Sequence, residues 1–169
     1  MAGSLKKAIV RKFSREWIAG YAAQEAVCRQ GLVELLDLES KRVLVPAQEI
    51  KWICYVRDFN SGELNNPERL LRKTFAGRPR IDGIHLRLKL ADGEILEGVA
   101  ANDRSLVAGE GVFLLPPDMR SNTQRIWIPA TSVAELEAVA VIGTATRRRP
   151  VPAVDEPSIG THTQPKLFE

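Results

Sequence analysis

The side chains in this sequence that are best placed for binding chemistry are basic rather than nucleophilic. His85 and His162 are its two histidines, and neither has a spacing that pairs it with a nucleophile or with further metal ligands. No phosphate-binding loop, dinucleotide fingerprint or HExxH motif occurs. Cys28 and Cys54 lack CxxC spacing, which favours free buried thiols. The sequence therefore predicts a non-enzymatic binding protein without cofactor or metal.

Basic residues gather in two stretches that a phosphate backbone could reach. Such clusters give salt-sensitive, sequence-independent affinity because they neutralise phosphates and release counterions. We therefore predict contact with RNA or DNA, while an ordinary solvated surface would give the same pattern. The residues are Arg69, Arg72, Lys73, Arg78 and Arg80, followed by Arg147, Arg148 and Arg149.

Net charge changes sign along the chain. Residues 1–56 and 57–80 each carry +3, whereas residues 81–143 carry −4 and residues 144–169 carry +1. This asymmetry indicates either an acidic partner for the first half or head-to-tail complementarity between copies, unless these charges are simply solvated.

The C-terminal residues 144–169 have the composition of a flexible, disordered tail. Residues 144–163 are rich in proline and small polar residues, and the chain then ends in QPKLFE. Gln164, Leu167 and Phe168 resemble the QxxLF peptide that binds bacterial sliding clamps. Glutamine would bond at the edge of a groove while the two hydrophobic side chains fill it. A hydrophobic terminus without function is the alternative.

Composition predicts a soluble, folded protein. The 169 residues are 44% hydrophobic and 27% charged, and no apolar run approaches the roughly 18–20 residues of a membrane span. The N-terminal residues lack the apolar centre of a secretory signal. We expect a cytoplasmic protein without membrane contact.

Two halves of the chain match in three segments of the same order, which predicts an internal duplication. RVLVP at 42–46 and RIWIP at 125–129 stand 83 residues apart, and this offset places Ile53 on Leu136. The other matches pair 15–22 with 93–100 and 31–37 with 111–118. We predict repeats at 1–57 and 81–143, joined by a basic linker at 58–80.

Each copy has the pattern of five short strands that close into a small barrel. Ile84, Leu86, Leu88 and Leu90 alternate with polar residues, including His85 on the wet face, and a turn signal follows at 91–93. In the linker, an N-cap at Asn66 and stop signals after residue 76 predict one short helix, with Arg69, Arg72 and Lys73 in solvent.

The run GIHLRLKLADGEILEGVAANDRSL, followed by RIWIPATSVAEL, resembles the Sm-like fold of Sm, LSm and Hfq proteins. This resemblance implies a mainly β protein of two tandem five-stranded small barrels, and the whole chain is similar to uncharacterised bacterial proteins of that kind. The positions of the Sm nucleotide pocket read Gly111-Val112 and Ile128-Pro129 here, so the resemblance implies the scaffold rather than the pocket.

Leu44 and Trp127 occupy equivalent positions in strands that are apolar on both faces. We expect them to cover the contact between the copies or between chains, or else to lie under the linker helix. The predicted function is a binding adaptor that contacts nucleic acid, docks on the sliding clamp and self-associates through barrel edges. The alternative is a protein assembly module without a nucleic-acid role.

Overall fold

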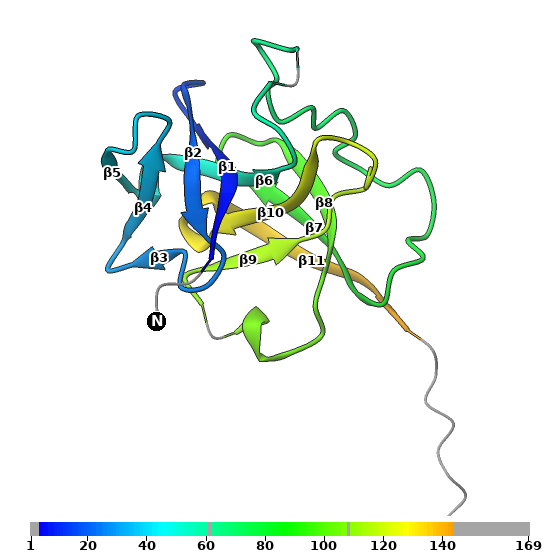
Figure 1. Cartoon of the computed structure of the whole chain (residues 1–169). Coiled ribbons are helices and arrows are strands. Elements are labelled where there is room, and N and C mark those ends of the chain that lie inside the picture. The colour runs from blue at the N-terminus through cyan, green and yellow to red at the C-terminus, as the bar shows by residue number, and fades with distance from the viewer. Residues whose placement is uncertain (1–3, 61, 108, 144–169) are drawn as a thin grey trace, which may run out of the picture.

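The computed structural model describes residues 4–60, 62–107 and 109–143, which form a mainly β protein (Figure 1). No helix in these ranges is long and apolar enough to span a membrane. The first half contains β1 (Leu5–Lys12), β2 (Trp17–Ala23), β3 (Cys28–Arg29), β4 (Leu32–Asp37), β5 (Arg42–Pro46), the 3₁₀ turn η1 (Ala47–Glu49) and β6 (Ile50–Val56). The second half contains β7 (Gly83–Leu90), β8 (Ile95–Ala100), η2 (Arg104–Leu106), β9 (Gly111–Leu114), β10 (Thr123–Pro129), η3 (Ala130–Ser132) and β11 (Val133–Ile142).

The strands form two sheets rather than the two closed barrels that the sequence predicts. One sheet has eight strands in the order β3-β4-β2-β1-β6-β10-β9, with β5 paired to β4, and the other has the order β11-β7-β8. An isolated bridge between Val99 and Leu115 links them. The prediction of closed barrels is wrong because β6 pairs with β10 of the other half and not with β5 of its own.

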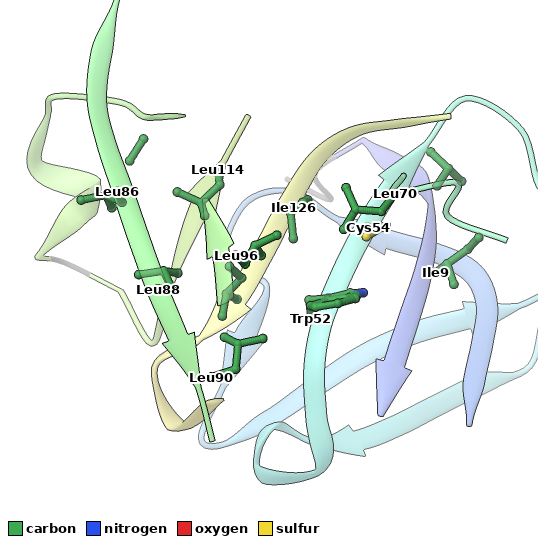
Figure 2. Close-up of a cluster of buried hydrophobic side chains, with 13 residues drawn as sticks. Ile9, Trp52, Cys54, Leu70, Leu86, Leu88, Leu90, Leu96, Leu114 and Ile126 are labelled. Atoms are coloured by element: carbon green, nitrogen blue, oxygen red, sulfur yellow. The ribbon is translucent and has the colours of Figure 1, made fainter. Parts of the chain in front are cut away.

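Strands β6 and β10 are buried on both faces, which explains their nearly continuous apolar sequences. Alternate residues of β6 point to two clusters: Trp52 and Cys54 to one, Ile53 and Tyr55 to the other. The first cluster is completed mainly by leucines of the second half, such as Leu88 (Figure 2). The second is built from the first half together with Trp127 of β10. The shared sheet therefore carries the cores of both halves.

The helix predicted in the linker is absent from the described part of residues 58–80, where turns, bends and irregular chain are found. Two short-range turn bonds occur within this segment, from the Arg69 N–H to Asn66 and from the Leu71 N–H to Arg69, and other backbone groups of it bond to the sheets. The carbonyl of Glu68 accepts a 2.7 Å bond from Thr123 Oγ1, and that of Lys73 accepts one from the Glu97 N–H at 2.6 Å. Arg69 has a φ of 49°, which an α-helix excludes. Contacts with the sheets outweigh the local helix signals.

Candidate functional site

Strands β5 and β11 each have one sheet edge without a partner in the described residues. β5 pairs only with β4, and β11 pairs only with β7. Each of these edge strands corresponds, in its place along the chain, to an internal strand of the other half: β5 corresponds to β10, and β11 corresponds to β6. β5 ends at Pro46 and is followed by η1 and β6, just as β10 ends at Pro129 and is followed by η3 and β11. β6 and β10 pair with each other as antiparallel strands, so their ladder shows which kind of strand the open edges of β5 and β11 could pair with.

The β6–β10 junction is antiparallel and buried. Trp127 lies opposite Ile53, Ile126 opposite Cys54 and Arg125 opposite Tyr55. Trp127 is 4% exposed, and the ten other buried members of its cluster all come from residues 8–55. The adjoining turns also touch, because Thr131 Oγ1 donates to the carbonyl of Ala47 at 3.4 Å and Ser132 Oγ donates to that of Ile50. Strand pairing, packing and turn contacts thus join the halves.

The corresponding positions at the outer edges are exposed. Leu44 on β5, which corresponds to Trp127, is 48% exposed, and Leu136 on β11, which corresponds to Ile53, is 57% exposed. Val139 and Val141 on β11 are exposed as well. An exposed apolar edge strand is a template for pairing with another chain. These two edges are therefore the candidate interaction site.

The structure does not bring the predicted basic residues of the linker into one cluster with their charges free. Arg69 pairs with Glu63 at 3.4 Å. Lys73, expected in solvent, is half-buried and forms an ion pair with Glu94. Arg72, Arg78 and Arg80 are exposed and have no ion pair within the described ranges, so they are the linker cations open to a phosphate.

The remaining predicted contact residues lie outside the described residues. These are the basic residues and the peptide of the tail, namely Arg147, Arg148, Arg149, Gln164, Leu167 and Phe168.

His85 is buried rather than exposed on a wet face. Its Nε2 lies 3.2 Å from Glu97 Oε2, and Arg87 Nε donates to Glu97 Oε1 at 2.8 Å. Burial alone would raise the pKa of Glu97, but bonds from the Phe75 N–H, Arg87 and His85 outweigh it, and the pKa is lowered. These contacts hold the linker to β7 and β8. No group of three His, Cys, Asp or Glu side chains placed to hold a metal occurs in the described chain.

Sequence reasoning missed Leu136 as a contact residue, although the repeat alignment already placed it on Ile53. Trp17 and Trp52 were also missed, because only the register of β2, β1 and β6 brings them to the same face.

The described chain is thus a mainly β protein in which two halves share one sheet and two apolar edges stay open. It belongs to a family of unknown function, DUF6982, which matches residues 4–140. No curated protein and no solved structure matches the chain.

Proposed function

We propose that this protein is a non-enzymatic assembly module whose copies join head to tail, the β5 edge of one chain on the β11 edge of the next. One observation carries the proposal. Trp127 and Ile53 are buried against each other at the internal junction, whereas Leu44 and Leu136, 83 residues from them, are exposed on open edges. A second chain would bury these side chains and supply the missing strand on both edges.

The internal junction also gives the register of the proposed one. Shifting each residue of the β6–β10 ladder by 83 places Leu44 opposite Leu136 and Arg42 opposite Ala138 of the next chain. By the same shift, Glu137 of β11 would lie opposite Val43 of β5, on the face away from Leu44 and Leu136. Such a contact is heterologous, and repeated copies form a ring if the rotation closes or a filament if it does not.

An internal duplication of an Sm-like strand order is part of this proposal. It is supported by the strand–3₁₀–strand sequence common to β5–η1–β6 and β10–η3–β11 and by the pairing of the first strand of each half with the second and the last. A cytoplasmic location belongs to the same proposal.

Light scattering after size-exclusion chromatography tests the assembly. We expect the full chain to be oligomeric, and the variants Leu44→Lys and Leu136→Lys each to be monomeric, because each places a charge in the contact. Each variant keeps one intact edge, so mixing the two should give a 1:1 dimer that does not grow further. An interface between two like edges would not give this complementation.

The matched control is Leu71→Lys, which changes an exposed leucine of the linker. It should leave the oligomer unchanged. A monomeric wild-type chain, or a Leu44→Lys variant that keeps the wild-type size, would overturn the proposal.

A second candidate function is contact with RNA or DNA, supported by the exposed Arg72, Arg78 and Arg80. The chain would then act as an adaptor, and the tail peptide of Gln164, Leu167 and Phe168 would dock on a sliding clamp. Binding of mixed-sequence RNA and DNA should fall steeply with added salt and weaken in an Arg72→Ala, Arg78→Ala, Arg80→Ala variant. Binding of peptide 160–169 to a bacterial clamp that survives Leu167→Ala and Phe168→Ala would eliminate the clamp contact.

A further inference from the structure

A groove of about 790 Å³ lies where β1, β2 and β6 meet the linker and the β7–β8 turn. Its lining combines two tryptophans with five basic and three acidic side chains, which gives it a net charge of +2. A hollow of this size with aromatic walls and a few placed polar groups is typical of small-ligand sites. The groove is formed by one chain and is separate from the β5 and β11 edges.

Three side chains form a row across its base. Arg11 on β1 lies opposite Trp17 on β2 and opposite Trp52 on β6. Directly opposed residues of antiparallel strands share one face of the sheet, and strands are about 4.8 Å apart, so the two indoles flank Arg11 at a spacing of about 10 Å. The guanidinium is held by both carboxylate oxygens of the buried Glu68, at 2.6 and 2.7 Å. The row is therefore fixed before any ligand arrives.

The indole of Trp52 carries a hydrogen-bond donor without an acceptor. Its Nε1 atom is buried and has no partner in the described structure. Figure 2 shows this nitrogen at the end of the ring directed away from Leu88 and Leu90 and toward the side of Leu70, which also lines the groove. The Nζ atoms of Lys51 and Lys73 lie 4.9 and 5.9 Å from the ring centroid. Since buried donors are nearly always satisfied, this unpaired donor beside the groove marks a position for a ligand acceptor or a water molecule.

The outer wall offers an aromatic face and a free cation. Trp17 is 40% exposed. Arg15, in the β1–β2 turn, is exposed and has a φ of 72°, and no carboxylate pairs with it in the described ranges. A second hollow is also lined by Lys12, Arg15 and Trp17, which it shares with the groove.

From this geometry we infer a nucleotide site, for a free nucleotide or for one unit of a single strand. The base stacks on Trp17, the phosphate lies at Arg15, and an acceptor of the ligand receives the Trp52 N–H. Aromatic stacking combined with a nearby cation is how proteins hold single-stranded nucleic acid without reading its sequence. This site is distinct from the linker arginines, and separate variants test the two: Trp17→Ala and Arg15→Ala for the groove, and the triple arginine variant for the linker.

Fluorescence anisotropy of the full chain with a labelled short oligouridylate tests the site. We expect Trp17→Ala and Arg15→Ala each to weaken binding about 10-fold or more, in the range of alanine substitution at a stacking platform. Trp52→Phe keeps an aromatic ring and removes the N–H, and it should weaken binding while the circular-dichroism melting curve stays cooperative. Competition by AMP at similar concentrations indicates a free-nucleotide site, and competition by oligonucleotide alone indicates a strand.

The matched controls are Tyr21→Ala, an exposed aromatic of the same strand as Trp17, and Arg29→Ala, an exposed arginine on β3. Both should bind as the wild type does. The inference is overturned if neither AMP nor the oligonucleotide binds at low salt, or if binding is unchanged by Trp17→Ala and Arg15→Ala. Binding that is lost only in the Arg72→Ala, Arg78→Ala, Arg80→Ala variant would assign nucleic acid to the linker and likewise overturn the groove.

Discussion

Trp127 of β10 lies directly opposite Ile53 of β6, and this pair joins the two halves of the chain. Ile53 is fully buried, and the indole of Trp127 extends into a cluster built from the first half. A side chain that belongs to the second half by sequence thus belongs to the first half by packing. The halves share their core, so the loss of this contact should affect the unfolding of the whole described fold.

We expect Trp127→Ala to lower the free energy of unfolding by about 3–5 kcal/mol, because it removes a large buried ring and leaves a cavity in the core. Urea unfolding followed by circular dichroism measures the change. Trp17→Ala is the matched control: because Trp17 is 40% exposed, this variant should lose far less free energy of unfolding. Equal losses in the two variants would show that the junction does not contribute more than a surface tryptophan.

Two glycines at matched places in the halves should not tolerate a methyl group. A Cβ atom at Gly20 would lie 2.2 Å from the carbonyl oxygen of Leu36, and one at Gly98 would lie 2.7 Å from Leu114 Cβ. We expect Gly20→Ala and Gly98→Ala to lower the melting temperature, because strands packed this closely must move apart. Gly77→Ala, where no atom lies within 4 Å of the new Cβ, should leave it unchanged. A melting temperature that is unchanged in all three would contradict this account.

The strands could be predicted because their signals are local. The alternation from Ile84 to Leu90 indicates one buried face, and β7 has its leucines in the core as expected. Pro46 and Pro129 end β5 and β10 and precede the 3₁₀ turns, since proline cannot donate a ladder bond there. The mainly β class followed directly from these patterns.

Closure and the linker could not be predicted because both depend on contacts distant in sequence. The apolar sequence of β6 fits a strand that closes the barrel of its own half and equally a strand that pairs with β10. Only the folded structure shows that it pairs with β10. The helix signals around Asn66 are outweighed by the Arg11–Glu68 ion pair and by bonds from Thr123 and Glu97. The polar alternation that placed His85 in solvent did not foresee that Phe75 of the linker would cover it.

The Arg11–Glu68 ion pair should hold the linker on the sheet. Glu68 is 1% exposed and bonds Arg11 through both oxygens. Glu68→Ala leaves the guanidinium without its counter-charge, and we expect a loss of about 3–5 kcal/mol in the free energy of unfolding. Trypsin should also cut faster at Arg69 and Arg72. Glu63→Ala breaks only the exposed pair with Arg69 and should cost less than about 1 kcal/mol. Unchanged cleavage in Glu68→Ala would rule out this anchoring role.

Acidification should destabilise the fold through Glu97. Bonds from the Phe75 N–H, Arg87 and His85 lower its pKa below the ordinary 4.5 despite burial, which acts in the opposite direction. A carboxyl with a lowered folded pKa contributes stability that is present above its unfolded pKa and is lost as the pH falls through the folded value. We therefore expect the free energy of unfolding to fall as the pH drops below about 4.5.

Glu97→Gln isolates this contribution from those of Asp92 and Glu94, whose pKa values are lowered as well. It removes the charge but keeps the shape, so it should lose about 1.5–3 kcal/mol at neutral pH, the range for a hydrogen bond to a charged group. Its stability should also fall less steeply with acid than that of the wild type. Glu135→Gln, which alters an exposed pair with Lys89, should keep the wild-type slope. Parallel pH profiles for Glu97→Gln and the wild type, measured by urea unfolding, would show that protonation of another group causes the acid loss.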